Sequence, residues 1–338
     1  MKIVVDDKIP YIQGQIERLA DEVLYLPGAA ITADDVRDAD VLIVRTRTRC
    51  NEALLEGSRV RLVVTATIGF DHIDTRYLER SGIQWTNCPG CNATSVAQYV
   101  RNTLYLLERE GQLAQPLDTL TLAIIGVGHV GTAVLEACRP LVRRVMLCDP
   151  PKGLNVPLDQ IAREADLITL HTPLIHGGQH PTYHLLDEMF FQHLQRRPVV
   201  INAARGGVLD ETSLLSALND GRVANAIIDT WENEPTPARV LLNKVYIGTP
   251  HIAGYSADGK ANATRMALEA VRAWMGKEDA DIQVCPPTLD KGIIPATNPI
   301  DRALQLYNPH EDSARLKHHP EEFEQLRGNY PLRREHFD

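Results

Sequence analysis

Three polar segments of the sequence carry side chains that together could do acid–base chemistry on a small anion. They read NAARGG at 202–207, DTWENEP at 229–235 and TPHIAG at 249–254. His251 can take up a proton near neutral pH, and Glu234 could hold its other ring nitrogen and stabilise the imidazolium. Arg205 can grip a carboxylate in a bidentate way and polarise a developing carbonyl. Each residue alone is more often structural, but the set suits the oxidation of a 2-hydroxy acid.

The hydride lost in such a reaction needs an acceptor, and a glycine-rich loop in the sequence suits a dinucleotide. The segment GVGHVG at 126–131 follows an apolar run and precedes a helical pattern. Gly126 permits a tight turn, Gly128 lets the backbone approach a pyrophosphate, and Gly131 allows a helix to pack closely on a strand. The amides at the helix start would face the phosphates. We expect cofactor contacts from Gly126, Val127, Gly128, His129, Val130 and Gly131.

A carboxylate after the next strand selects between the two nicotinamide dinucleotides. Asp149 ends the apolar run at 144–148. A carboxylate in this place accepts hydrogen bonds from the ribose hydroxyls and repels a 2′-phosphate. The sequence therefore predicts NAD rather than NADP as the cofactor, with Asp149 in its site.

Short apolar strands alternate with helical stretches along most of the chain. Strands are predicted at 3–5, 41–44, 62–65, 121–125, 144–148, 167–170, 199–202, 226–229 and 245–248, and helices at 12–20, 52–56, 94–110, 132–137 and 257–274. This alternation predicts an α/β protein with two Rossmann-like, doubly wound parallel-sheet domains. Ligands of such sheets bind beyond the carboxyl ends of strands, and Arg205, Glu234 and His251 each follow a predicted strand.

The amino-acid composition changes after Gly276, and this change indicates a domain boundary. Residues 282–299 are rich in proline, and residues 311–334 are polar with alternating charge. We expect a substrate-binding lid domain at 1–93, completed by about 257–280, and an NAD-binding domain at 94–256. Residues 281–338 are expected to form a short C-terminal α+β dimerisation segment.

Bulk composition excludes several classes of function. The formal net charge is −9, whereas nucleic acids and membrane surfaces attract positively charged proteins. The first residues do not resemble a signal peptide, and no apolar run approaches the ~18 residues needed to span a bilayer, so we expect a cytoplasmic protein. Cys88 and Cys91 resemble half of a redox or zinc motif, but no second ligand pair stands at close spacing. We therefore expect a plain loop there and no metal.

The motifs named above, with HTPL at 171–174, resemble those of the D-isomer-specific 2-hydroxy-acid dehydrogenase family. The resemblance implies that Arg205 binds the substrate carboxylate and lies beside NAD. It also implies that Glu234 supports the histidine and that His251 transfers the proton. Further cofactor contacts are implied for Thr172, Ala203, Ala204 and Asp229.

Within that family, other segments resemble the erythronate-4-phosphate dehydrogenase branch of pyridoxal 5′-phosphate (vitamin B6) biosynthesis. They are VRTRTRCN at 44–51, ATIGFDHID at 66–74, PGCNATSVAQYV at 89–100, CDPP at 148–151 and HIAGYSADGKANAT at 251–264. The resemblance implies oxidation of 4-phospho-D-erythronate to 3-hydroxy-2-oxo-4-phosphooxybutanoate by a homodimer. It implies substrate contacts from Thr46, Thr67 and Tyr255, and an NAD contact from Gly254. That branch carries a longer C-terminal dimerisation domain than residues 281–338 would form, so we expect a shortened one here.

An arginine cluster agrees in part with a phosphorylated substrate. Arg45, Arg47 and Arg49 alternate just after the predicted strand at 41–44, and an extended chain would place all three on one face. They could cradle a phosphate, with hydroxyls of Thr46 and Thr67 adding hydrogen bonds, and Arg45 is our first candidate. The alternative is an ordinary solvated arginine cluster.

Two other interpretations of the whole chain stay open at this point. One is a different dehydrogenase of the same family, such as a 3-phosphoglycerate dehydrogenase or a glyoxylate/hydroxypyruvate reductase. The other is a non-catalytic NAD(H)-sensing protein on the same scaffold. The presence of Arg205, Glu234 and His251 together weighs against the sensor, as does the acidic net charge.

Overall fold

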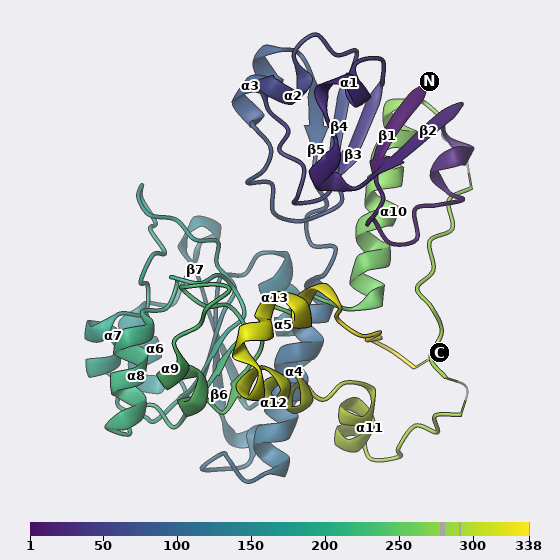
Figure 1. Cartoon of the computed structure of the whole chain (residues 1–338). Coiled ribbons are helices and arrows are strands. Elements are labelled where there is room, and N and C mark those ends of the chain that lie inside the picture. Colours follow the sequence, from purple (N-terminus) through teal and green to yellow (C-terminus); the bar gives the residue numbers. More distant parts are fainter. Residues whose placement is uncertain (278–280, 291, 338) are drawn as a thin grey trace. The chain divides into compact units, whose positions relative to one another are not determined.

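The computed structural model describes residues 1–277, 281–290 and 292–337, and the chain forms two compact units (Figure 1). Unit 1 comprises Met1–Asn92 and the described part of 257–288. Unit 2 comprises Ala93–Ser256 and the described part of 289–338. The first unit is therefore discontinuous in sequence, because the chain leaves it at residue 92 and returns at residue 257.

Unit 1 is built on a five-stranded parallel sheet in the order β2-β1-β3-β4-β5. Its strands are β1 (Lys2–Asp6), β2 (Glu22–Leu26), β3 (Val41–Val44), β4 (Leu62–Thr65) and β5 (Gln84–Thr86). Every residue of β3 and β4 is buried, as expected for parallel strands covered on both faces. The helices of this unit are α1 (Ala33–Val36), α2 (Glu52–Leu55), α3 (Thr75–Arg80) and α10 (Ala257–Trp274). Small and apolar residues of α10, such as Ala267 and Leu268, pack into the core of this sheet.

Unit 2 is built on a seven-stranded sheet in the order β12-β11-β10-β9-β6-β7-β8. Its strands are β6 (Thr121–Ile125), β7 (Arg144–Asp149), β8 (Leu154–Asn155), β9 (Leu167–Leu170), β10 (Val199–Asn202), β11 (Asn225–Ile228) and β12 (Ile247–Gly248). All neighbours pair in parallel except β8, which pairs antiparallel with β7. The winding direction reverses between β6 and β9, and a crevice for a ligand opens at such a switch point.

Helices of unit 2 complete the doubly wound arrangement. They are α4 (Ala93–Arg109), α5 (His129–Cys138), α6 (Leu158–Glu164), α7 (Glu188–Gln192), α8 (Glu211–Asn219), α9 (Arg239–Lys244), α11 (Pro299–Leu306), α12 (Pro309–His318) and α13 (Phe323–Gly328). Helix α4 packs against α5, and its fully buried Tyr99 and Leu104 join the same core as strand β6. The long helices α4 and α10 begin within one residue of their predicted positions.

The predicted α/β class with two parallel sheets is confirmed, but several elements differ from the sequence-based prediction. Strands β2, β5 and β8 were not predicted. The helix expected at 12–20 is only a single 3-10 turn at Ile16–Arg18, preceded by Gly14 with a φ of +80°. A residue in this left-handed conformation interrupts a helix, and glycine adopts it at little cost.

The C-terminal segment, residues 289–337 as described, packs on unit 2 as helices. Asn298 and Asn308 cap α11 and α12 with their side chains, and a proline follows each cap, which is a favoured helix start. Leu316 and Phe323 are buried in the core of unit 2. The described part of this segment contains no strand, so the expected α+β character is wrong in its strand component. The capping signals explain why helices form instead.

Side chains at the end of this segment are buried although they are charged. Arg333 is 3% exposed, and its guanidinium donates to the Gln98 side chain at 2.8 Å and to the carbonyls of Ser95 (2.6 Å) and Ile252 (3.2 Å). Its guanidinium carbon also lies 3.7 Å from the centre of the Tyr307 ring. The segment is therefore fastened to α4 and to the loop after β12.

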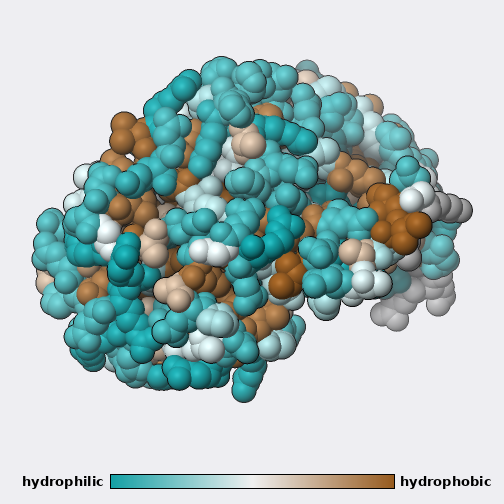
Figure 2. Space-filling view, turned by 90° about the horizontal axis from the view of Figure 1, so that it is seen from below, coloured by the Kyte–Doolittle hydropathy of each residue, from teal (hydrophilic) through white to brown (hydrophobic). Residues whose placement is uncertain are grey.

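The face of the molecule drawn in Figure 2 is mostly hydrophilic, and its apolar residues lie in separate patches. Within residues 1–277, 281–290 and 292–337, none of the helices has both the length and the apolar character needed to cross a bilayer.

We predict that Arg333→Met lowers the free energy of unfolding by about 2–4 kcal/mol, because Gln98 and the buried carbonyls lose their donor. Urea denaturation followed by circular dichroism measures this change. Arg315→Met is the matched control, since that side chain is 52% exposed and its pairing with Asp312 contributes little. Equal stability of the two variants would contradict an anchoring role for Arg333.

Candidate active site

The loop after β6 has the geometry that the glycine pattern predicts. Gly126 has a φ of +88°, and a side chain there would lie 2.7 Å from the His171 backbone. A side chain at Gly131 would lie 1.9 Å from the Gly126 carbonyl oxygen. Both positions therefore require glycine. At Gly128, which caps α5, a side chain would meet nothing within 4 Å, so the space beside the amides at the helix start is open.

Polar groups around this loop fit NAD. The Val127 amide donates to one Asp149 carboxylate oxygen at 2.7 Å, which leaves the other oxygen as an acceptor for ribose hydroxyls. Thr172 follows β9, directly beside the loop, and its buried hydroxyl has no partner among the described residues. Val127, His129 and the open amides at the start of α5 would hold the phosphates. These donors and acceptors match a dinucleotide at the switch point between β6 and β9.

His251 and Glu234 form a hydrogen-bonded pair at the carboxyl edge of the same sheet. His251 Nδ1 lies 2.8 Å from a Glu234 carboxylate oxygen, and the two side chains are 28% and 22% exposed. The other Glu234 oxygen accepts from the Trp231 amide at 3.0 Å. Burial alone would raise the pKa of Glu234, but the hydrogen bond and charge of His251 outweigh burial and lower it. Glu234 is therefore an anion at neutral pH, and it leaves His251 Nε2 for the substrate.

The loop that carries the histidine, residues 249–254, is called the His251 loop here. His251 itself has a φ of +56°. Asp229 is 1% exposed, and its carboxylate accepts from the Thr249 hydroxyl (2.6 Å) and from the amides of Ile252 (2.8 Å) and Ala253 (3.0 Å). Asp229 thus shapes the His251 loop, a role the sequence did not suggest. Its expected contact with the cofactor stays a prediction, as does that of Gly254 in the same loop.

Arg205 follows β10 and is exposed, with its guanidinium donating to the Ala204 carbonyl at 2.8 Å. Asn202 fixes this turn, because its side chain bonds the Ala204 amide and the carbonyls of Arg205 and Thr230. The turn therefore holds Ala203 and Ala204 at the carboxyl end of β10, the strand between β9 and β11. The structure places Arg205 on the strand end predicted for it, and its substrate contact stays a prediction.

The expected substrate residues of unit 1 follow two neighbouring strands. Arg45 and Thr46 come after β3, and Thr67 comes shortly after β4, which pairs with β3 in parallel. The Arg45 guanidinium donates to the Lys8 carbonyl at 3.0 Å, and the Thr67 hydroxyl donates to the Gly69 carbonyl at 2.8 Å. These residues lie at one edge of the unit 1 sheet, where ligands of parallel sheets bind.

The extended chain expected through Arg45, Arg47 and Arg49 is wrong. The chain turns at residues 46–48 instead of continuing as a strand. Thr48 is buried in this turn, where its hydroxyl donates to the Gly28 carbonyl at 2.8 Å. This tertiary bond draws the chain inward and leaves Arg47 and Arg49 exposed.

Sequence reasoning missed two cations near the predicted substrate residues. In unit 1, Lys260 of α10 has a pKa lowered first by burial and then by the charge of Arg45. In unit 2, the Arg327 guanidinium of α13 donates to the Tyr255 hydroxyl at 2.9 Å. Lys260 lies inside a quoted motif, but neither pairing can be read from spacing, because the partners are far apart in the sequence.

The paired cysteines are buried thiols. Burial raises the pKa of Cys88 to about 12 and that of Cys91 to about 11. The Cys88 thiol donates to the Ala263 carbonyl at 3.2 Å, which ties the loop to α10. Protonated, buried thiols are poor nucleophiles, so the plain-loop interpretation fits this geometry.

We predict that Asp149→Ala raises the Kd for NAD by about 10- to 100-fold, because one charged acceptor serves both the loop amide and the ribose. Isothermal titration calorimetry measures the change. Asp159→Ala is the control, since its carboxylate is on the surface and pairs only with Arg163 within the described residues. An unchanged Kd would exclude Asp149 from the cofactor site.

We predict that Glu234→Gln lowers kcat on the order of 10²-fold, because a neutral amide no longer stabilises the imidazolium that forms when His251 takes the proton. Steady-state rates at neutral pH measure this change. Glu232→Gln, two residues away, is expected to keep kcat near the wild-type value. A wild-type kcat for Glu234→Gln would argue against the pair.

Comparison with known proteins agrees with this site. Residues 92–253 match the family model of the D-isomer specific 2-hydroxyacid dehydrogenase, NAD binding domain. A D-lactate dehydrogenase from Treponema pallidum shares the fold with a TM-score of 0.68 at 22% identity, covering 84% of this chain and 100% of that one. A D-lactate dehydrogenase from Aquifex aeolicus, solved with NAD and lactic acid, gives a TM-score of 0.60 at 23% identity, covering 85% and 100%.

Relatives that match over nearly their full length narrow the family to which the chain is assigned. An erythronate-4-phosphate dehydrogenase from Bacteroides thetaiotaomicron is 52% identical over 341 residues, covering 99% of this chain and 97% of the relative. One from Escherichia coli O157:H7 is 40% identical over 352 residues, covering 99% and 92%. With an NAD loop and a His–Glu pair at the edge of one sheet, the chain belongs to the NAD-dependent erythronate-4-phosphate dehydrogenase family of D-2-hydroxyacid dehydrogenases.

Proposed function

We propose that this protein oxidises 4-phospho-D-erythronate with NAD to 3-hydroxy-2-oxo-4-phosphooxybutanoate, a step of pyridoxal 5′-phosphate biosynthesis. The 2.8 Å pair of His251 and Glu234 carries the proposal, because it supplies an oriented base at the carboxyl edge of the sheet that also carries the dinucleotide loop. The names of the relatives support the choice of substrate.

Three residues of unit 2 have separate roles in the proposed reaction. Bound NAD supplies the acceptor for the hydride that leaves carbon 2. His251 Nε2 takes the proton of the C2 hydroxyl, and anionic Glu234 stabilises the imidazolium at Nδ1. Arg205 binds the C1 carboxylate and polarises the new carbonyl oxygen. In the reverse direction the same imidazolium returns its proton.

The residues of unit 1 support an anionic substrate. The charge of Arg45 acts on the half-buried Lys260, and a bound anion would offset the repulsion between these two cations. Thr46 and Thr67 lie at the same sheet edge and would add hydroxyl donors. This basic pair favours an anionic substrate over a neutral one.

We also infer a homodimer in the cytoplasm. The C-terminal segment exposes apolar side chains, with Ile294 83% and Leu332 52% exposed, and such residues favour burial against a second copy. All six cysteines are free thiols, which is usual in a reducing compartment.

A substrate panel followed by nicotinamide absorbance tests the function. We expect NAD reduction with 4-phospho-D-erythronate at a kcat/KM well above that with 3-phosphoglycerate, glyoxylate or hydroxypyruvate in their respective directions. His251→Ala should lower kcat by about 10²–10⁴ while NAD still binds. NAD binding without turnover of any panel member would favour a sensor instead, and a preference for 3-phosphoglycerate would make the substrate assignment wrong.

A further inference from the structure

An arginine of the C-terminal segment contacts Tyr255 in the unit that also holds His251 and Glu234. The Arg327 Nε group donates to the Tyr255 hydroxyl at 2.9 Å, and its guanidinium carbon lies 5.6 Å from the centre of the Tyr255 ring. The charge of Arg327 also contributes to lowering the pKa of Glu234, after the larger contribution of His251. Arg327, Tyr255 and Glu234 all belong to unit 2, so their arrangement lies within one compact body.

Arg327 is a half-buried cation on which the charges of Glu234 and Glu324 act, but it forms no close ion pair with a carboxylate among the described residues. None of the ion pairs within residues 1–277, 281–290 and 292–337 uses its guanidinium, and its single described hydrogen bond goes to a neutral phenol. The nearby carboxylate of Glu234 is engaged by His251 and by the Trp231 amide. Four terminal N–H groups of the guanidinium therefore remain to receive an anionic ligand.

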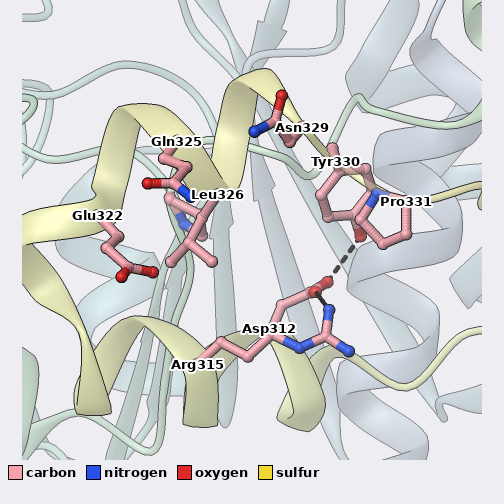
Figure 3. A pocket seen from close by; sticks show the side chains of 9 residues that line it. Asp312, Arg315, Glu322, Gln325, Leu326, Asn329, Tyr330 and Pro331 are labelled. Carbon is pink, nitrogen blue, oxygen red and sulfur yellow. Dashed lines mark hydrogen bonds and ion pairs between the residues drawn. The ribbon is translucent and has the colours of Figure 1, made fainter.

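Three polar residues in or next to the helix that carries Arg327 face a different place. Glu322, Gln325 and Asn329 line a cavity of about 140 Å³ against Asp312, Arg315 and Pro250 (Figure 3). Residues three or four apart share one helix face, whereas Arg327 is offset from Leu326 on that face by about 100°. Phe323 fixes this orientation because it is buried in the core of unit 2. Arg327 is thus separated from the side chains that line this cavity, whereas Glu324, three residues before it, shares its face of α13.

We propose that Arg327 determines substrate specificity by binding the phosphate of the substrate together with the Tyr255 hydroxyl. The inference rests on the proposed function, which supplies a substrate with a carboxylate at one end and a phosphate at the other. Arg205, on a separate loop after β10, is the candidate for the carboxylate. A planar guanidinium next to a hydroxyl offers the fork of donors that phosphate oxygens accept. The C-terminal segment would then contribute a residue to the active site.

Two substrates that differ only in the phosphate test this role in the full-length protein. We expect Arg327→Gln to lower kcat/KM for 4-phospho-D-erythronate by about 10- to 100-fold, mainly through KM, since one charge-assisted contact is lost. The same variant should change kcat/KM for D-erythronate by less than about threefold. Arg327→Lys keeps the charge without the fork and should fall between the two. Arg315→Gln, on α12 with an exposed side chain, should match the wild type.

Inorganic phosphate provides a second readout that does not depend on turnover of D-erythronate. We expect it to inhibit the wild type competitively against substrate and to bind Arg327→Gln at least about tenfold more weakly. Equal losses on both substrates, or unchanged inhibition by phosphate, would overturn the proposal and leave Arg327 a positioning residue for Tyr255 and Glu234. A wild type inactive on 4-phospho-D-erythronate would instead contradict the proposed function.

Discussion

The active site depends on how one buried carboxylate holds the His251 loop. Asp229 stands at the end of β11 and accepts hydrogen bonds from Thr249, Ile252 and Ala253, which flank the histidine on both sides. His251 has a φ of +56°, a conformation that costs a residue with a side chain about 1–3 kcal/mol. Hydrogen bonds to a buried charge are strong enough to offset this cost. The imidazole is thereby turned toward Glu234 and held there before any substrate arrives.

The C-terminal segment supports the same loop through a second set of contacts. Arg333 donates to the Ile252 carbonyl, and Glu335 accepts from the Ser256 hydroxyl at 2.6 Å. Loop and segment are thus parts of one body, although they are distant in the sequence. The polar and charged residues of this segment, which the sequence suggested as a dimerisation segment, satisfy buried groups of α4 and of the His251 loop. If Arg327 binds phosphate, the segment that stabilises the site also contributes to substrate specificity.

The cofactor end of the site follows from the order of the strands. β6 and β9 are neighbours, but their connecting helices leave in opposite directions, so the loops after these strands diverge. Gly126 and Thr172 line this opening from the two sides, and Asp149 reaches it from β7. Because Asp149 also bonds the Val127 amide, the residue proposed to select NAD also fixes the loop proposed to bind its phosphates.

The sequence by itself determined the local features of this protein. Buried strands and long amphipathic helices were evident because a strand or a helix stripe needs only neighbouring residues to be recognised. The glycine loop, Asp149 and the trio Arg205, Glu234 and His251 could be found because parallel-sheet folds place such residues at strand ends. The short edge strand β2 was not predicted, since its half-exposed residues show no clear pattern. The helix predicted at residues 12–20 is interrupted by the left-handed conformation of Gly14.

The tertiary structure decided every feature that depends on residues far apart in the chain. The buried role of Asp229, the turn that separates Arg45 from Arg47 and Arg49, and the contact of Arg327 with Tyr255 all come from long-range hydrogen bonds. A one-dimensional pattern records which side chains are present, but not which donor meets which acceptor when the chain closes on itself. The candidate catalytic residues could therefore be proposed in advance, whereas the contacts that hold them were fixed only by the folded structure.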